Sequence, residues 1–250
     1  MTTQLALLSD VHANLHALDA VLADIAARPG LLGPYHLGDL VGYHAFPNEV
    51  TARLRDEGIA GVAGNYDSTV AMRYKHCGCR SENPRQEELA HESFSWTLAT
   101  VSVETRTTLA ALPFRLDVRP LGGHVAGPTV ILLHATPTSN LVYVTEDRSD
   151  DFLRKMAAQA GANAGDVIAF GHTHKPWHRL VDDVLYVNTG SVGRPKDGDP
   201  RAGWTLITLG DAAPRAEQVR VAYDIEAACA AVAAAGLPEE FAQSLRTGRA

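Results

Sequence analysis

Five short polar motifs each follow an apolar run, and together they supply the side chains that bind divalent metal ions. They contain two carboxylates, one amide and four imidazoles: Asp10, Asp39, Asn65, His12, His134, His172 and His174. Oxygen and imidazole ligands without thiolate suit hard or borderline metals. Each motif alone has an ordinary structural explanation, such as a turn or a core histidine. Their ordered recurrence after successive apolar runs indicates a metal site.

The ligand inventory suffices for two divalent ions that share one carboxylate, and Asp39 is the natural candidate for the shared ligand. Two ions contribute +4 and Asp10 with Asp39 contribute −2, so the centre attracts anions although the chain carries a net charge of −7. A metal-bound water has its pKa lowered from about 15.7 towards about 7. Two ions about 3.5–4 Å apart can also hold a phosphoryl group during in-line attack. Such a centre could therefore supply a shared hydroxide and clamp a phosphoryl group.

The elements that must position these residues read as alternating strands and helices. Apolar runs predict buried strands at five places, and helical spacing predicts helices between them. The expected strands cover residues 5–8, 35–37, 59–63, 129–133 and 166–170; the expected helices follow Asn14 and cover 47–57 and 150–160. This alternation predicts a parallel sheet with crossover helices. Because the carboxyl ends of such strands line one edge, the ligands should converge on one cleft.

Local geometry gives two finer expectations within this scheme. In extended backbone, residues i and i+2 project to the same side, so Asp10 and His12 are expected to share one ion. His172 and His174 follow Gly171 in a looser turn and can divide between two ions.

The remainder of the chain reads as one domain, residues 1–250, with a helical insert at 68–128. Residues 86–112 within that insert are predicted to be helical. Residues 180–223 are rich in strand signals, and residues 225–245 are predicted to form a helix.

Composition limits the class of protein. With 46% hydrophobic and 20% charged residues in 250, the chain is an ordinary globular one. Its acidity argues against stable nucleic-acid binding. No apolar run reaches the roughly 20 residues that span a bilayer, and the N-terminus lacks a basic leader, so we expect a cytoplasmic protein without membrane contact. Three cysteines cannot build a disulfide framework, and Cys77 and Cys79 are interpreted as two unlinked thiols in a loop rather than as zinc ligands.

The five motifs resemble the signature blocks of the calcineurin-like metallophosphoesterase superfamily. The matching blocks are Asp10-Val11-His12, Gly38-Asp39, Gly64-Asn65-Tyr66-Asp67, His134 and Gly171-His172-Thr173-His174. The resemblance extends from about residue 5 to residue 204. It is closest to the small bacterial and archaeal phosphodiesterase branch, whose late loop is similar to residues 188–195. It implies a four-layer α/β/β/α sandwich with two mixed β-sheets and a two-metal active site.

The resemblance also implies how the ligands divide. One ion would be held by Asp10, His12, Asp39 and His174, and the other by Asp39, Asn65, His134 and His172. Members of the family use manganese, iron, zinc or nickel. We expect manganese, and the ligand set is compatible with the other three metals.

Two departures from the family pattern stand out, Ala13 for glycine and Tyr66 for histidine. The histidine is usually assigned to stabilising the transition state or to protonating the leaving group. A tyrosine, with a pKa of about 10, is a weaker acid at pH 7, and poor leaving groups need an acid most. With Asn65 and Tyr66 as catalytic residues, the hypothesis is a preference for phosphodiesters or good leaving groups. The alternative is that Tyr66 only packs over the cleft.

Four further residues are candidates for contacting the substrate or for orienting the metal ligands. Asn14 and Arg194 are candidate substrate contacts, although Asn14 is equally suited to capping the first helix. His36 and Asp67 are expected to orient metal ligands.

The predicted function is metal-dependent hydrolysis of a small phosphate ester, with cyclic-nucleotide-type diesters favoured. The alternatives are a nucleotidase, a dinucleoside polyphosphate hydrolase, or a non-catalytic binding scaffold on the same fold. Whether the chain forms a homo-oligomer through the insert is an open question.

Overall fold

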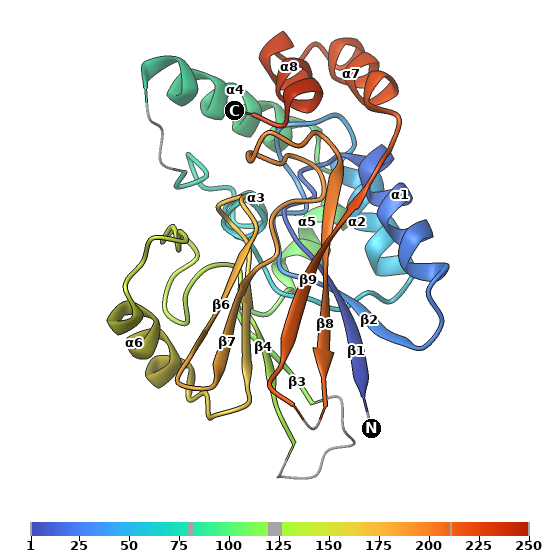
Figure 1. Ribbon diagram of the computed structural model, residues 1–250. Coiled ribbons are helices and arrows are strands. Elements are labelled where there is room, and N and C mark those ends of the chain that lie inside the picture. Colours follow the sequence, from blue (N-terminus) through green and yellow to red (C-terminus); the bar gives the residue numbers. More distant parts are fainter. Residues whose placement is uncertain (1, 80–82, 120–126, 211, 250) are drawn as a thin grey trace.

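Two mixed β-sheets, packed face to face, present the strand ends from which the predicted ligands emerge (Figure 1). The computed structural model describes residues 2–79, 83–119, 127–210 and 212–249. The first sheet has the order β2-β1-β8-β9 and contains β1 (Thr3–Leu8), β2 (Leu31–His36), β8 (Ala202–Leu209) and β9 (Arg215–Val221). Strands β1 and β2 are parallel, and β8 and β9 extend the sheet in antiparallel fashion.

The second sheet has the order β3-β4-β5-β7-β6. It contains β3 (Leu116–Val118), β4 (Val130–Leu132), β5 (Val167–Phe170), β6 (Trp177–Val181) and β7 (Val184–Asn188). Its central strands β4, β5 and β7 are parallel, and the two edge strands are antiparallel. Both sheets are therefore mixed.

Alternating side chains of each sheet enter two different apolar clusters, which produces four layers. In β1, Leu5 and Leu7 face the second sheet, whereas Ala6 and Leu8 face the helices on the outer side of the first sheet. In β5, Ala169 faces the first sheet, whereas Phe170 packs with the outer helix α6 (Asp150–Ala160). Period-two burial on both faces of a strand is the pattern of a sheet covered on both sides. The four-layer α/β/β/α arrangement is thus observed.

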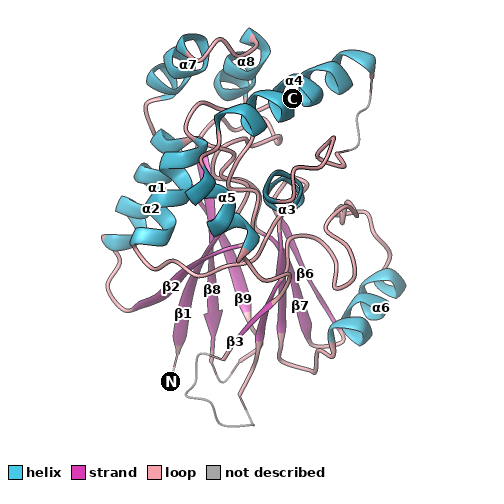
Figure 2. Cartoon of the chain, turned by 180° about the vertical axis from the view of Figure 1, so that it is seen from behind, coloured by secondary structure: helices cyan, strands magenta, loops and turns pink. Residues whose placement is uncertain are grey.

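The remaining helices cover the outer side of the first sheet and the end of the molecule where the ligands gather (Figure 2). They are α1 (Leu15–Ala26), α2 (Pro47–Asp56), α3 (Asn65–Ala71), α4 (Pro84–Thr100), α5 (Val103–Ala110), α7 (Ile225–Ala234) and α8 (Glu239–Thr247). Helices α4 and α5 account for the helical content predicted at 86–112; residues 120–126 of the expected insert lie outside the described residues. No described helix combines the length and apolarity needed to cross a membrane.

Several elements differ from the sequence-based prediction, and three of them have a clear physical reason. Residues 59–63 form only a single bridge, from Gly61 to His36, because the chain then turns and the Ala63 N–H donates to the carbonyl of Pro113. Strand β6 was not predicted, since its edge position leaves its middle exposed. The helix predicted at 225–245 is divided at residues 236–238, where Gly236 adopts a left-handed φ of 69° and Pro238 lacks an N–H donor.

His36, at the end of β2, makes stability sensitive to acid. Burial lowers the pKa of His36 to about 4, whereas the unfolded chain has a value of about 6.5. Between those values the unfolded state binds more protons, so stability falls as the pH falls. We expect His36 to remove about 2 kcal/mol of unfolding free energy between pH 7.5 and pH 5.

Urea denaturation of the wild type and of His36→Gln at the two pH values measures this contribution. The variant should lose less stability on acidification, and His178→Gln, at an exposed position on β6, should behave like the wild type. Equal losses in the wild type and His36→Gln would contradict the assignment.

Candidate metal centre

The seven predicted ligands meet at the carboxyl ends of four strands. Asp10 and His12 follow β1, and Asp39 follows β2; His134 follows β4, His172 and His174 follow β5, and Asn65 begins α3. None of the seven side chains belongs to a residue more than 5% exposed. The structure therefore brings together all of the side chains proposed from the sequence as metal ligands, and it draws them from both sheets.

The first cluster contains Asp10, His12 and His174. The Nε2 atoms of His12 and His174 lie 3.1 Å apart. Oδ1 of Asp10 lies 3.3 Å from Nε2 of His174 and 3.8 Å from Nε2 of His12. Three potential ligand atoms thus surround one point.

The second cluster contains Asp39, His134 and His172, and Asn65 lies beside it. Nε2 of His134 is 3.1 Å from Nδ1 of His172 and 3.0 Å from Oδ1 of Asn65.

A single carboxylate oxygen connects the two clusters. Oδ2 of Asp39 lies 3.7 Å from Nε2 of His12 and 3.6 Å from Nε2 of His134. The other oxygen, Oδ1, accepts a hydrogen bond of 2.9 Å from the backbone N–H of Tyr66, so the carboxylate is held in this orientation. Asp39 consequently occupies the position that a shared ligand needs.

Hydrogen bonds to the protein backbone fix which nitrogen of three histidines carries the proton. Nδ1 of each lies close to a main-chain carbonyl: His12 to Val41 (3.0 Å), His134 to Leu37 (2.8 Å) and His174 to Arg194 (2.6 Å). A carbonyl can only accept, so Nδ1 donates, and in the neutral ring Nε2 is left with a lone pair directed into the cluster.

Those lone pairs show that the donor set fits cations. Burial lowers the pKa of both His12 and His174 well below its ordinary value, which favours their neutral forms. Two lone pairs 3.1 Å apart repel unless a cation lies near both. Oδ1 of Asp10 and Nε2 of His172 are buried and have no hydrogen-bond partner among the described residues. Burial also raises the pKa of Asp39 to about 8, which a bound dication would reverse.

Asp67 holds the loop that carries Asp39. Its carboxylate accepts hydrogen bonds from the backbone N–H groups of Asp39 (2.8 Å), Leu40 (2.8 Å) and Gly64 (2.9 Å). The orienting contact predicted for Asp67 is thereby confirmed. The described residues show no hydrogen-bond partner for Nδ1 of His36, so no orienting contact is seen there.

The backbone of the ligand loops is left-handed, which contradicts the extended conformation expected for Asp10 and His12. Their φ values are 53° and 48°, and Ala13 has 56°. The backbone N–H groups of these residues donate to the carbonyls of Gly38, Asp39 and Leu40. These bonds hold the loop that carries Asp10 and His12 against the loop that carries Asp39. Such conformations cost about 1–3 kcal/mol each and collect at functional sites. Long-range hydrogen bonding, rather than local preference, brings Asp10 and His12 together.

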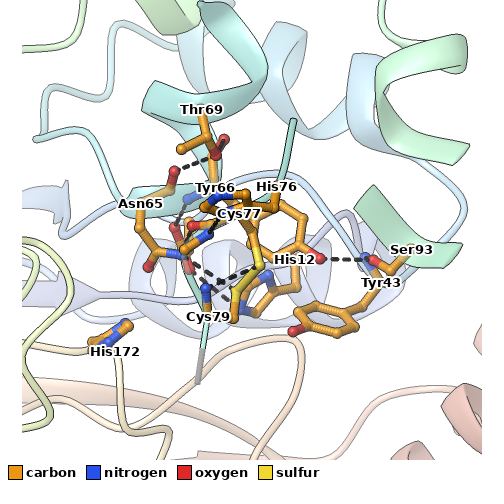
Figure 3. The surroundings of a disulfide bond; sticks show 12 residues. His12, Tyr43, Asn65, Tyr66, Thr69, His76, Cys77, Cys79, Ser93 and His172 are labelled. Carbon is orange, nitrogen blue, oxygen red and sulfur yellow. Dashed lines mark hydrogen bonds and ion pairs between the residues drawn. A yellow bond between two sulfur atoms is a disulfide. The ribbon is translucent and has the colours of Figure 1, made fainter. Parts of the chain in front are cut away.

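The orientation of the Asn65 amide depends on a segment 12 to 14 residues away (Figure 3). Its Nδ2 donates to the carbonyl of Cys77 at 3.1 Å and lies 3.6 Å from Sγ of Cys79. With the NH₂ group engaged there, Oδ1 faces His134. Cys77 and Cys79 are joined by a disulfide, so the expectation of two unlinked thiols is wrong. The two cysteines lie close enough in a tight loop to pair, which their spacing alone did not reveal.

The hydroxyl of Tyr66 points towards α4 and forms a 3.0 Å hydrogen bond with Oγ of Ser93 (Figure 3). The residue is fully buried, and burial raises the pKa of Tyr66 well above 10. Its ring lies 5.7 Å from His12 and 5.1 Å from Tyr43. This arrangement favours a packing role, and a catalytic role for Tyr66 stays a prediction.

A cleft of about 710 Å³ opens above the two clusters. Helices α4 and α8, the segment around Tyr143 and the loop at 194–196 form its walls. Four cationic side chains line it: Lys175, Arg194, Lys196 and Arg249. The one carboxylate of the outer wall, Glu240, is already paired with Arg85 at 2.6 Å. No local sequence pattern predicts that α8 lies at the site, because its placement depends on contacts with distant residues such as Tyr43.

Arg194 lines this cleft, as predicted for a substrate contact, whereas Asn14 is not among the lining residues. Oδ1 of Asn14 accepts from the N–H of Ala17 and caps α1, and its Nδ2 donates to the carbonyl of Gly193. With both ends engaged, a substrate contact for Asn14 stays a prediction that the geometry does not favour.

Comparison with known proteins agrees with this geometry. Residues 3–212 match the calcineurin-like phosphoesterase superfamily domain. An uncharacterized protein of Methanocaldococcus jannaschii is 33% identical over 264 residues, which cover 99% of each chain. The crystal structure of a metallophosphoesterase from Sphaerobacter thermophilus is similar at 27% identity and a TM-score of 0.75, covering 98% of this chain and 99% of that one. A hypothetical protein from Pyrococcus horikoshii shares the fold, with 19% identity, a TM-score of 0.81, and coverage of 99% and 100%.

Proposed function

The chain belongs to the calcineurin-like phosphoesterase superfamily, and we propose that it is a hydrolase that uses two divalent metal ions to cleave small phosphodiesters, with cyclic nucleotides favoured. One observation carries the proposal. Oδ2 of Asp39 lies 3.7 Å from a histidine nitrogen of one cluster and 3.6 Å from a histidine nitrogen of the other. A single oxygen in that position suits two ions that share a ligand.

The residues of the centre have separate tasks in this proposal. One ion would be held by Asp10, His12, Asp39 and His174, and the other by Asp39, Asn65, His134 and His172. When bound, the ions supply Lewis acidity and a nucleophilic hydroxide at neutral pH. The chain itself fixes three imidazole tautomers through backbone carbonyls and keeps the ligands away from bulk water. We propose manganese, and iron, zinc and nickel suit the same donors.

The cleft supports a small substrate. Its volume of about 710 Å³ lies within the range of small-molecule sites, roughly 300–1,000 Å³. Helices α4 and α8 supply part of the walls of this cleft, and both lie at the end of the molecule where the ligands gather (Figure 2).

The four cationic side chains of the cleft favour a second candidate within the same chemistry. A nucleotidase or a dinucleoside polyphosphate hydrolase handles substrates with more negative charge than a diester, and Lys175, Lys196 and Arg249 would suit them. A non-catalytic scaffold is disfavoured because every predicted ligand position is filled.

Initial rates with bis-p-nitrophenyl phosphate and p-nitrophenyl phosphate test the proposal on chelator-stripped protein with manganese restored. We expect hydrolysis that requires the metal, two ions per chain by elemental analysis, and faster cleavage of the diester. Faster cleavage of the monoester would favour a nucleotidase over a diesterase. Protein that binds two ions yet hydrolyses neither compound, nor nucleotide substrates, would sustain the scaffold instead.

A further inference from the structure

Arg194 is tied through its backbone to a predicted metal ligand. Its carbonyl oxygen lies 2.6 Å from Nδ1 of His174 and accepts the proton that fixes that ring. Its N–H donates to Oγ of Ser191 at 2.8 Å. The position of the residue relative to the first cluster is thus fixed without using its side chain, so a side-chain substitution leaves the support of His174 in place.

The side chain of Arg194 is held against an aromatic wall of the cleft. The guanidinium carbon lies 3.8 Å from the centroid of the Tyr43 ring, which itself lies 5.0 Å from the ring of His12. Nε of Arg194 is buried and has no hydrogen-bond partner among the described residues. A buried donor without an acceptor is costly. An anionic oxygen in the cleft would remove that cost.

Two tyrosines, Tyr43 and Tyr66, complete this wall, and one serine of α4 anchors both of them. Oγ of Ser93 binds the hydroxyl of Tyr66 at 3.0 Å and accepts from the backbone N–H of Tyr43 at 2.8 Å, which anchors both residues to α4. Among the described residues of the wall, Tyr43, Tyr66 and Arg194, the arginine alone carries a charge. Its guanidinium keeps its positive charge at neutral pH and acts as a fixed cation rather than as an acid.

In-line attack places the leaving group on the side of phosphorus opposite the attacking oxygen. An attacking oxygen that approaches from the side of the clusters therefore directs the leaving group into the cleft, which Arg194 lines. We propose that Arg194 is a catalytic residue that stabilises the negative charge growing on the leaving-group oxygen, and that Tyr66 only braces the wall beside it. The inference rests on the proposed hydrolase function.

Arg194 transfers no proton when the phosphoester bond is cleaved. The attacking hydroxide oxygen forms a bond to phosphorus while the bond from phosphorus to the leaving oxygen breaks. The electron pair of the broken bond stays on the leaving oxygen, which is protonated later by solvent. Arg194 contributes charge and hydrogen-bond donors throughout, as fixed donors do at sites of developing charge.

A series of aryl phosphate esters whose leaving-group pKa varies tests this role in manganese-loaded protein. For Arg194→Ala we expect kcat to fall by roughly 10²-fold or more with the poorest leaving groups and by less than about 10-fold with p-nitrophenol. The dependence of kcat on leaving-group pKa becomes steeper as a result. Millimolar guanidinium ion should restore part of the lost rate in Arg194→Ala and none in the wild type. Tyr66→Phe should retain the wild-type dependence on leaving-group pKa.

Arg28→Gln is the matched control, because the Arg28 guanidinium lies 5.0 Å over Trp204 and outside the cleft; it should behave as wild type. A parallel fall for all esters in Arg194→Ala, or a steeper dependence in Tyr66→Phe, would overturn the inference. Arg194→Lys, which keeps charge without the planar fork, gives an intermediate slope if Arg194→Ala folds poorly. Wild-type protein without metal-dependent hydrolysis would instead refute the proposed function, so the two failures are distinguishable.

Discussion

Asp39→Asn is expected to lower kcat for phosphoester hydrolysis by roughly 10³-fold and to leave fewer than two metal ions per chain. The substitution keeps the size of the side chain but removes the negative charge of an oxygen that lies 3.7 Å from Nε2 of His12 and 3.6 Å from Nε2 of His134. An asparagine can also present its NH₂ group to the histidine lone pairs, where it competes with a cation. Metal analysis and steady-state kinetics on the purified variant measure the two effects.

Substitutions of two other aspartates serve as references for the effect of Asp39→Asn on kcat. Asp67→Asn removes the charge that holds the Asp39 loop, and we expect a loss of only about 10–100-fold, typical of groups that support a metal ligand. Asp166→Asn changes another buried aspartate that accepts backbone hydrogen bonds, outside the cleft, and it should leave kcat unchanged. If Asp39→Asn retained two ions and wild-type kcat, Asp39 would not be the shared ligand.

Gly64→Ala is expected to disrupt the same ligand through packing. A Cβ atom on residue 64 would lie 2.0 Å from Oδ1 and 2.3 Å from the backbone nitrogen of Asp39. Because one of these atoms belongs to the main chain, the loop that carries Asp39 must move as a whole. We expect loss of about 1–3 kcal/mol of unfolding free energy, as overpacking usually costs, together with a kcat reduced by more than about 10²-fold.

Denaturant unfolding and kinetics separate those two effects when Gly161→Ala is measured alongside. Gly161 ends α6 with a left-handed φ of 67° and has open space where a Cβ would be placed. Its substitution should cost about 1 kcal/mol through the backbone alone and should leave kcat unaltered. Wild-type kcat in Gly64→Ala would show that the loop tolerates displacement of Asp39.

The sequence predicts correctly those helices and strands whose ends are determined by neighbouring residues. Helix α6 matches the predicted range 150–160 because Ser149 caps its first turn and Gly161 ends it in a left-handed conformation. Strand β5 matches because a four-residue apolar run is buried on both faces. The convergence of the ligands could be predicted from their positions after apolar runs, but the alternation of elements predicted one parallel sheet, whereas the ligands come from two mixed sheets.

Features that depend on distant partners could not be predicted in the same way. The left-handed φ of His12 follows from its bond to the carbonyl of Asp39, and the direction of the Tyr66 hydroxyl follows from Ser93 on α4. The position of α8 over the cleft depends on packing such as that of Phe241 against Tyr43, whose ring centroids are 5.5 Å apart. None of these contacts has a local sequence pattern, because each partner comes from a separate element.

Each ligand cluster takes side chains from both sheets, so a bound metal ion would link the stability of the fold to the metal supply. Asp10 and His12 come from the first sheet and His174 from the second; Asp39 comes from the first, and His134 from the second. A cation held by either cluster therefore fastens the two sheets together at one edge, and the unfolded chain offers no such site. At a free ion concentration 100 times the dissociation constant, one such ion adds about 2.7 kcal/mol to the unfolding free energy. The amount of folded protein in a cell would then rise and fall with its pool of free metal.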